Sequence, residues 1–286
     1  MNDLVAGVDI GGTHITSGIV NTQTGELLGH SIFRASIDPT LDKEAVIHQW
    51  ASAIRECFLQ AMLPVGKIGI AMPGPFDYES GISYITGLHK YEKLYGQNVK
   101  NLLSSELQIS AYDIQMINDA SAYLYGEVIH GAGKGYTNLA GITLGTGLGS
   151  ASWYEDAIHE GDLWNMPFES LRAEDYVCAR WLITEYEKRS GVKVDGVKAI
   201  AERVDADKVA AELFVEFGRN LGQVLCLRYQ QQSPEAIIVG GNIAKAWNCF
   251  VPTVQRVFRQ NQFTAMLEQA RLGENASMIG ASCLWA

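Results

Sequence analysis

The stretch LVAGVDIGGT, residues 4–13, joins an apolar strand to an aspartate and a double-glycine turn, and the chain re-enters a strand at residues 15–20. Gly11 and Gly12 let backbone N–H groups approach phosphate oxygens without interference from a Cβ atom. Thr13 adds a hydroxyl donor, and Asp9 at the strand end can hold a hydrated magnesium ion. A strand, a two-glycine turn and a strand also make an ordinary hairpin. Alone, the segment therefore leaves a phosphate-binding hairpin and a purely structural one equally open.

The second half of the chain repeats this construction. The apolar run LAGITL, residues 139–144, leads into GTGLG, residues 145–149, and the chain leaves through a further strand at residues 150–153. The run GTGLG lacks the later glycine and helix of a dinucleotide-binding fold, and no GxxxxGK[ST] loop occurs anywhere in the sequence. Two hairpins of this kind predict a protein of two lobes.

A third glycine turn follows another apolar run. The stretch AIIVGGNIA, residues 236–244, reads as a buried strand that ends in Gly240 and Gly241 at the start of a helix. Backbone without side chains can lie flat against a nucleotide, but such a turn also allows a helix to pack closely on a strand. Both interpretations stay open for this turn taken singly.

The three turns, in this order and at these separations, resemble those of sugar kinases of the ROK family (repressors, uncharacterised open reading frames and kinases), within the hexokinase–actin superfamily of ATPases. The resemblance covers nearly the whole chain. Further matching stretches are AMPGPFD at 71–77 ("PGPvD"), INDASA at 117–122 ("NDAnA"), Gly126-Glu127 with GAGKG at 131–135 ("GE…GAGkG") and IGAS at 279–282 ("iGAa"). The resemblance implies an α/β, two-lobed actin-like ATPase fold, related to ribonuclease H, with a cleft between the lobes. It also implies an ATP- and magnesium-dependent kinase.

Asp119 is the residue that the resemblance assigns as general base. Phosphoryl transfer to a sugar hydroxyl needs a group that accepts the hydroxyl proton, a magnesium ion and donors that hold the triphosphate in line. Asp119 follows the apolar strand 114–117 and opens a helix over 120–129, which would direct its carboxylate out of a strand-to-helix corner. An isolated aspartate in that position is more often a helix N-cap. Its place within the motif favours the catalytic role.

The other residues of the matching motifs receive roles from the same resemblance. Asp9 would position magnesium through water, or else cap backbone amides at the strand end. Asn118 would bind the sugar, or else serve as a turn residue. Gly74 is placed on the sugar side as well. Phosphate contacts are expected from Gly11, Gly12, Thr13, Gly145, Thr146 and Gly147, while Gly240 and Gly241 would lie beside the adenosine.

The sequence departs from the family where sugar recognition is expected. Most members carry a "GEiGH" segment, but here residues 160–168 read EGDLWNMPF. If Gly161 aligns with the first glycine of that motif, Asp162 replaces the glutamate and Asn165 replaces the histidine. Downstream, AEDYV at 173–177 resembles the family's "lEayas" helix and places Glu174 at a third sugar-binding carboxylate. A surface acid near a helix N-terminus explains Glu174 equally well.

The family's zinc-binding cysteine cluster has no counterpart. No CxCGxxGC pattern exists, and Cys226 and Cys249, the closest pair of cysteines, are 23 residues apart, so we expect no structural zinc. We expect Trp164, Met166 and Phe168 to pack as a small apolar cluster in its place. His14, His89 and His159 stand on separate segments without i, i+4 spacing, which favours loop histidines over a metal site. TGLHKY at 86–91 also replaces the family's asparagine and "lpgW" segment, so glucose is not assured as substrate.

Composition limits the partners. The chain has 286 residues, 47% of them hydrophobic, which is enough for one large core or two ordinary ones. A formal charge of −10 repels nucleic acid, and because the first hairpin begins within ten residues we expect no DNA-binding module ahead of it. There is no signal-peptide pattern and no run of 18 apolar residues. We therefore expect a soluble cytoplasmic chain with a sugar substrate, no membrane contact and, by resemblance only, a homodimer.

Hydrophobic periodicity gives the expected organisation. Predicted strands lie near 4–8, 15–20, 31–35, 68–72, 114–117, 139–144, 149–153 and 236–240, and predicted helices near 43–61, 98–106, 206–230, 243–261 and 277–285. We expect an N-terminal lobe over 1–118 and a C-terminal lobe over 119–274, with the helix at about 275–286 folded back on the first lobe. The sequence thus favours a kinase of a hexose or hexose derivative. The alternative is a catalytically impaired sugar- or nucleotide-binding regulator of the same fold.

Overall fold

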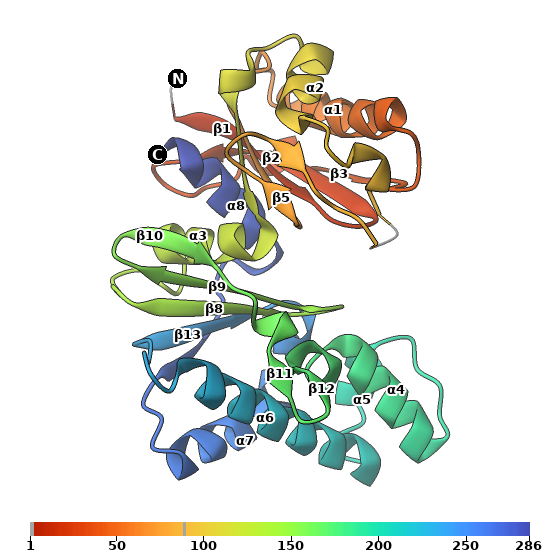
Figure 1. The fold of residues 1–286 in the computed structure, drawn as a ribbon, viewed down its shortest axis with the longest axis vertical. Coiled ribbons are helices and arrows are strands. Elements are labelled where there is room, and N and C mark those ends of the chain that lie inside the picture. The colour runs from red at the N-terminus through yellow and green to blue at the C-terminus, as the bar shows by residue number, and fades with distance from the viewer. Residues whose placement is uncertain (1–2, 88–89) are drawn as a thin grey trace. The chain divides into compact units, whose positions relative to one another are not determined.

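The chain forms two compact units, each built on its own sheet of five strands (Figure 1). The computed structural model describes residues 3–87 and 90–286. The first unit comprises Met1–Lys134 together with Glu274–Ala286, and the second comprises Gly135–Gly273. The predicted mixed α/β architecture is confirmed. The division falls after Lys134 rather than after residue 118, because the helix that begins at Asp119 packs on the C-terminal helix of the first unit.

The sheet of the first unit combines an antiparallel hairpin with parallel strands. Its order is β3 (Phe33–Ser36), β2 (His14–Asn21), β1 (Leu4–Ile10), β4 (Ile68–Met72) and β7 (Ile114–Asn118). Strands β3, β2 and β1 pair antiparallel, whereas β1, β4 and β7 run parallel. Strand β4, which lies between β1 and β7, is buried along its whole length, as expected of a parallel strand covered on both faces. A short hairpin of β5 (Phe76–Asp77) and β6 (Ile82–Ser83) follows β4.

One face of this sheet is covered by α1 (Lys43–Gln60) and α2 (Val99–Leu107). Helix α1 begins after Asp42, whose carboxylate accepts the Ala45 N–H at 2.8 Å as an N-cap. Its buried residues, among them Trp50 and Ile54, pack against the alternate apolar residues of β1. The pattern of the sheet therefore follows from period-two burial on the strands and helical periodicity on α1.

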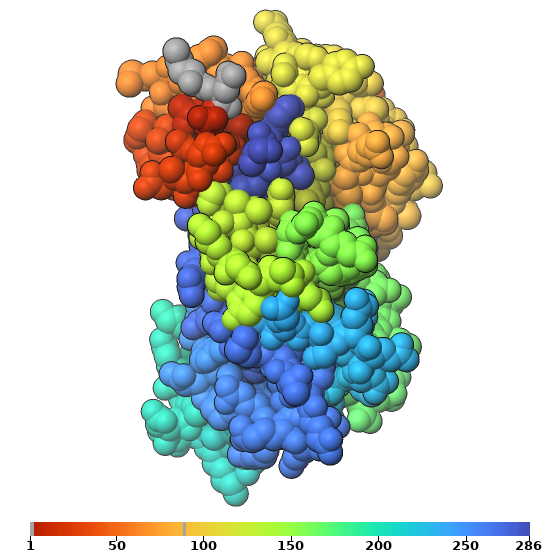
Figure 2. Space-filling view, turned by 90° about the vertical axis from the view of Figure 1, so that its left-hand side faces the viewer, coloured from red at the N-terminus to blue at the C-terminus, as the bar shows by residue number. Residues whose placement is uncertain are grey.

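The opposite face carries α3 (Asp119–His130) and α8 (Ala276–Ser282). Glycines make this close packing possible: a Cβ atom at Gly69 would lie 1.9 Å from the Ala281 carbonyl oxygen, and one at Gly7 would lie 2.2 Å from that of Met278. Figure 2 shows the C-terminal residues, in dark blue, between the red N-terminal segment and the yellow-green segment of the same unit. The last helix of the chain is thus part of the first unit.

The second unit repeats the strand arrangement of the first. Its order is β10 (Ala157–Glu160), β9 (Leu148–Tyr154), β8 (Leu139–Leu144), β13 (Ala236–Gly240) and β14 (Met266–Gln269). Strands β10, β9 and β8 pair antiparallel, and β8, β13 and β14 run parallel. A two-stranded hairpin of β11 (Pro167–Phe168) and β12 (Leu171–Arg172) leaves this sheet after β10.

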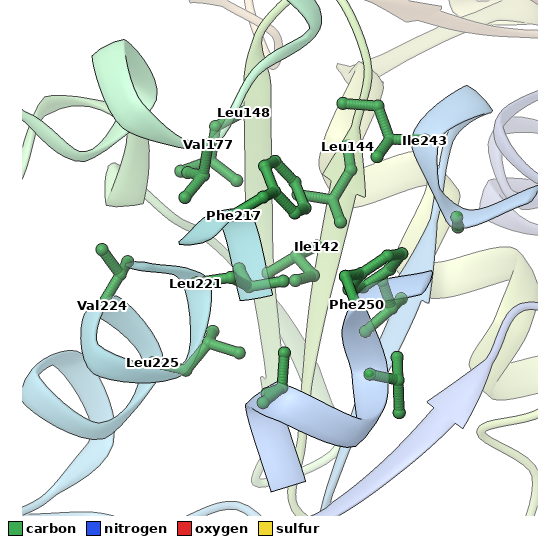
Figure 3. Packing of buried hydrophobic residues seen from close by; sticks show 14 of the residues in the cluster. Ile142, Leu144, Leu148, Val177, Phe217, Leu221, Val224, Leu225, Ile243 and Phe250 are labelled. Atoms are coloured by element: carbon green, nitrogen blue, oxygen red, sulfur yellow. The ribbon is translucent and has the colours of Figure 1, made fainter. Parts of the chain in front are cut away.

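The core of the second unit lies between this sheet and its helices. The helices are α4 (Ala179–Ser190), α5 (Val197–Ala201), α6 (Lys208–Tyr229) and α7 (Trp247–Gln260). Phe217 and Leu221 of α6 lie close to Ile142 of β8 (Figure 3). The Phe217 and Phe250 rings meet edge to face, with centroids 5.4 Å apart. A Cβ atom at Gly218 would lie 2.5 Å from the Phe250 carbonyl oxygen, so this glycine allows α6 and α7 to cross closely.

Short 3₁₀ helices complete the described chain. They are Gly29–Ser31, Glu92–Leu94, Ala111–Asp113, Leu163–Asn165, Ala173–Tyr176, Asn242–Ala246, Gly273–Asn275 and Cys283–Trp285. Across the described parts of the chain, residues 3–87 and 90–286, no helix combines the length and the apolar character that a membrane span needs.

Candidate active site

One edge of the first sheet gathers polar residues and glycines. Strands β1, β4 and β7 run parallel, so their carboxyl ends meet at this edge, and Met72 pairs with Asn118 in register. The structure thereby places there seven residues predicted from the sequence: Asp9, Gly11, Gly12, Thr13, Gly74, Asn118 and Asp119. Topology alone explains how motifs more than a hundred residues apart in the chain converge.

Asn118, rather than Asp119, caps helix α3. The Asn118 side-chain oxygen accepts the N–H groups of Ala120 at 2.9 Å and Ser121 at 3.1 Å, which is the usual N-cap geometry. One Asp119 carboxylate oxygen also accepts the Ala120 N–H at 2.9 Å, while its other oxygen has no hydrogen bond to the described residues. Capping is therefore carried by Asn118, and Asp119 keeps one carboxylate oxygen available for chemistry.

The two carboxylates of this edge influence each other. Burial and, to a smaller extent, the nearby Asp119 charge raise the pKa of Asp9 to about 6, against the lowering effect of the Arg34 charge. Burial also raises the pKa of Asp119, against the lowering effects of the Ala120 N–H and the Lys90 charge. Two partly buried acids that repel each other form a site whose charge a divalent cation would relieve.

These acids do not make up a complete metal cage. Within residues 3–87 and 90–286, no group of three or more His, Cys, Asp and Glu side chains is placed to hold a metal ion. Mg²⁺ usually keeps several water ligands and needs only one or two protein carboxylates beside substrate phosphates. The Asp9 and Asp119 pair therefore fits a magnesium ion held mainly through water and phosphate.

Tyr78 is a residue of this edge that the sequence analysis missed. Its hydroxyl donates to the Met72 carbonyl at 2.9 Å and accepts from the Asn118 side-chain nitrogen at 3.3 Å. The same hydroxyl lies 3.2 Å from the position that a Cβ atom would take on Gly74. Tyr78 thus fixes the orientation of the Asn118 amide. No motif pointed to it, because its role depends on the spatial neighbours of β4 and β7.

The first glycine hairpin has two backbone donors without a partner among the described residues. The Gly11 N–H bonds the His14 carbonyl at 2.9 Å, and the Tyr91 hydroxyl donates to the Gly11 carbonyl. The N–H groups of Gly12 and Thr13 make no hydrogen bond to any described residue. Adjacent free N–H groups in a turn form the concave donor set that binds anions.

The second unit brings its own two glycine turns together. Strands β8 and β13 are parallel neighbours, with Thr143 paired to Gly240, so the turns that follow them share one edge of the second sheet. Gly241 has φ of +85°, and a Cβ atom there would lie 2.4 Å from the Leu144 carbonyl oxygen. The close-packing interpretation therefore explains Gly241 on its own, and this packing sets the Gly240-Gly241 turn beside Gly145.

Glu174 is positioned on the turn of residues 145–147. Its carboxylate accepts the Leu148 N–H at 2.9 Å, and a Cβ atom on Gly147 would lie 2.6 Å from the same oxygen. The turn itself is closed by the Gly145 N–H bonded to the Gly147 carbonyl at 3.0 Å. Thr146, at the tip, is exposed. The sequence allowed two roles for Glu174, a surface acid or a sugar-binding carboxylate. The structure places its carboxylate against the second hairpin.

The altered segment 160–168 is attached to β9 through Ser150. The Gly161 N–H bonds the Ser150 carbonyl at 3.0 Å, and the Leu163 N–H bonds the Ser150 hydroxyl at 3.1 Å. Asp162 and Asn165 stand at the two ends of the turn that follows, joined by a backbone bond of 2.9 Å, and both side chains are exposed. They are available to a ligand.

The prediction that Trp164, Met166 and Phe168 pack together was wrong for Trp164. Phe168 is buried and meets Tyr176 edge to face at 5.5 Å, and Met166 packs on the same core. Trp164 instead stays 41% exposed, with the Arg172 guanidinium 5.6 Å from its ring. The Trp164 ring therefore makes a cation–π contact with Arg172 instead of packing in the core.

The three histidines singled out in the sequence have separate surroundings. His14 is exposed, with its Nδ1 2.9 Å from the Thr13 hydroxyl. His159 stacks on Tyr154 at 3.8 Å between ring centroids. His89 lies outside the described residues.

Known proteins resemble this chain in sequence and in fold. The sequence matches the model of the ROK family over residues 5–164 and 173–286, and the unmatched residues 165–172 include the β11–β12 hairpin. A polyphosphate glucokinase of Mycobacterium tuberculosis strain H37Rv is 30% identical, covering 96% of this chain and 89% of that protein.

Two solved structures share the fold over nearly all of this chain. A ROK family glucokinase from Streptomyces griseus, in complex with glucose and AMPPNP, superposes with a TM-score of 0.80 at 24% identity, covering 98% of each chain. A ROK family transcriptional regulator, a homologue of the E. coli MLC protein, gives 0.83 at 19% identity, covering 99% of this chain and 77% of the other.

Proposed function

The chain belongs to the ROK family, as a carbohydrate kinase of that family, and we propose that it transfers the γ-phosphoryl group of ATP to a hydroxyl of a hexose or hexose derivative. The observation that carries this proposal is that Asn118 and Asp119, at the end of β7, have different hydrogen-bonding roles. Asn118 caps the helix, which leaves a carboxylate oxygen of the partly buried Asp119 without a partner among the described residues. A base of raised pKa that is free at a strand edge suits proton abstraction from a hydroxyl.

Asp119 would accept the proton of the sugar hydroxyl as that oxygen attacks the γ-phosphorus. Asp9 would orient a magnesium ion through water, and the free N–H groups of Gly12 and Thr13 would bind phosphate oxygens. When bound, the ion offsets the negative charge of the phosphates. Burial of Asp9 beside Asp119 supports this assignment, since a cation there removes an unfavourable pairing of like charges.

The glycine turns of the second unit would serve the nucleotide. Gly145, Thr146 and Gly147 would bind phosphate oxygens, and the Gly240-Gly241 turn would lie beside the adenosine. Nothing lies within 4 Å of a Cβ position on Gly145, which leaves that backbone accessible to a ligand.

The sugar would be held by polar side chains and by the backbone of one glycine. We assign to it Asn118, Gly74, Asp162, Asn165 and Glu174. The Asn118 oxygen is used by the cap and one N–H of its side-chain nitrogen is donated to Tyr78, so the second N–H is the group left for a sugar hydroxyl. One Glu174 oxygen accepts the Leu148 N–H, and the other, which lies 4.0 Å from the exposed Arg180 guanidinium, would serve the same purpose.

Two alternatives follow from specific observations. The relative named polyphosphate glucokinase favours inorganic polyphosphate as a second candidate donor. The altered segment 160–168 and the structural likeness to a ROK family transcriptional regulator favour a regulator that binds sugar without phosphorylating it.

The test is ADP production with magnesium over a panel of hexoses and N-acetylated hexosamines, with polyphosphate replacing ATP in a parallel series. Asp119→Asn should abolish sugar-dependent turnover while sugar binding persists. Asp113→Asn is the matched control, because Asp113 directly precedes β7 at its opposite end. Turnover with neither donor, while a sugar still binds, would replace the kinase assignment with the regulator.

A further inference from the structure

Lys90 and Tyr91 lie directly on the first glycine hairpin. The atom nearest to a Cβ position on Gly12 is the Lys90 Cδ, at 3.7 Å. The next residue, Tyr91, donates its hydroxyl to the carbonyl of Gly11, 80 residues away in the sequence. Two consecutive residues of one segment therefore contact two consecutive residues of the hairpin.

Tyr91 fixes this segment through several contacts. It is 1% exposed and has φ of +54°, a left-handed conformation that is uncommon for a residue with a side chain. Its N–H bonds the Pro39 carbonyl at 2.8 Å, and its ring meets that of Trp50 edge to face at 5.0 Å. Left-handed residues held by their surroundings cluster at functional sites. The position of Lys90 is thus set by the fold.

The Lys90 ammonium is available to a ligand. Lys90 is partly exposed and makes no ion pair or hydrogen bond with the described residues. Lys100, by contrast, donates to the Glu79 carbonyl at 2.6 Å. The Lys90 charge nevertheless reaches Asp119, whose pKa is raised mainly by burial and lowered in part by Lys90. A free cation is therefore carried by a side chain that lies beside the hairpin and whose charge acts on the proposed base.

We propose that Lys90 is a catalytic residue that binds the phosphoryl group while it passes from the donor to the sugar. In this step the sugar oxygen forms a bond to phosphorus and its proton goes to Asp119. The bond from phosphorus to the bridging oxygen breaks, and the leaving phosphate takes the electron pair. Lys90 gives charge and hydrogen bonds to the phosphoryl oxygens and exchanges no proton. This inference rests on the proposed function.

Steady-state kinetics test the inference on three variants: Lys90→Met, Lys90→Arg and Lys93→Met. We expect Lys90→Met to lower kcat by about 10²–10³, the usual effect of removing one donor to a developing charge, with the KM for sugar little changed. Lys90→Arg should restore part of kcat. Lys93→Met changes an exposed lysine three residues on and should behave as wild type.

The pH profile separates a catalytic role from a structural one. Without the Lys90 charge the pKa of Asp119 rises, so the acidic limb of kcat/KM should move to higher pH in Lys90→Met. Lys90→Arg should keep the wild-type limb. A kcat within twofold of wild type in a folded Lys90→Met protein would overturn the inference.

A binding measurement keeps the inference testable if the wild type shows no turnover. Acetylation of Lys90 is followed by mass spectrometry with and without magnesium ATP, and with tripolyphosphate as a second probe. Slower acetylation of Lys90 but not of Lys93 would support phosphate binding even if the kinase assignment fails. Equal acetylation of Lys90 with and without both probes would refute it.

Discussion

The two sheets share one strand plan but carry different chemistry at corresponding positions. In the first unit Asp9 stands one residue before the end of β1, whereas Thr143 stands one residue before the end of β8. After the third parallel strand, the first unit has Asp119 and the second has Ala270. The carboxylates of raised pKa at a strand edge thus belong to the first unit. The shared plan supplies glycine turns in both units, whereas the carboxylates that we propose for magnesium binding and catalysis lie in the first unit.

The largest difference between the units is expected in kcat, when one carboxylate is replaced in each unit. We expect Asp119→Asn to lower kcat by about 10²–10⁴, because a general base is lost. Glu174→Gln should mainly raise the KM for sugar, since the amide oxygen can still accept the Leu148 N–H. Steady-state kinetics on both variants measure the difference. A larger loss of kcat in Glu174→Gln than in Asp119→Asn would contradict the assignment of the general base to the first unit.

The glycines of the second unit should separate into structural and ligand-binding ones. Gly241→Ala requires a left-handed alanine and puts its Cβ against the Leu144 carbonyl, so we expect a loss of about 2–4 kcal/mol in the free energy of unfolding. Gly145→Ala meets no atom within 4 Å and should cost less than about 1 kcal/mol, while it weakens nucleotide binding. Urea denaturation and nucleotide titration distinguish them. Equal destabilisation by both would contradict this division.

The acidity of Asp9 predicts the effect of pH on stability. Folding raises the pKa of Asp9 from 3.8 to about 6, so the folded protein holds a proton that the unfolded chain releases between these values. This group therefore costs stability as pH rises from 4 through 6, and the full cost applies above pH 6. Asp9→Asn removes it, and we expect that variant to gain about 1–3 kcal/mol over wild type at pH 8 in magnesium-free buffer.

The same comparison at pH 4 provides the control. There Asp9 is largely protonated in the folded protein, so the gain from Asp9→Asn should shrink toward zero. Chemical denaturation at both pH values measures it. A gain that is equal at pH 4 and pH 8 would exclude burial of the Asp9 charge as its cause.

The sequence predicted much of the candidate site at the edge of the first sheet, because strand ends and glycine turns have recognisable local sequence patterns. The strands at 4–8, 68–72 and 114–117 and the turns after them are present within a few residues. Strand β14 and helix α4 were not predicted, because α4 is mostly polar and β14 is short and partly exposed. The hydroxyl contact of Tyr78 with Asn118 and the left-handed Tyr91 depend on neighbours distant in sequence, which no local pattern encodes. The cap by Asn118 is local, but the sequence analysis gave this residue a sugar-binding or turn role instead.

The smallest effect should come from the side chains that hold the two hairpins. The Tyr91 hydroxyl holds the Gly11 carbonyl in the first unit, and the Glu174 carboxylate holds the Leu148 N–H in the second. Tyr91→Phe keeps the ring against Trp50 but loses this bond, so we expect a loss of about 1 kcal/mol in the free energy of unfolding. Because Lys90 precedes Tyr91, kcat should fall a few-fold in the same variant.

The control for this last variant is Tyr112→Phe, since Tyr112 is 92% exposed and belongs to the same unit. It should leave both the free energy of unfolding and kcat unchanged. If Tyr91→Phe loses stability with kcat intact, the hydroxyl supports only the fold of the hairpin. A fall in kcat under conditions where the Tyr91→Phe protein is fully folded would instead indicate that catalysis requires the first hairpin to be held in place by this hydroxyl.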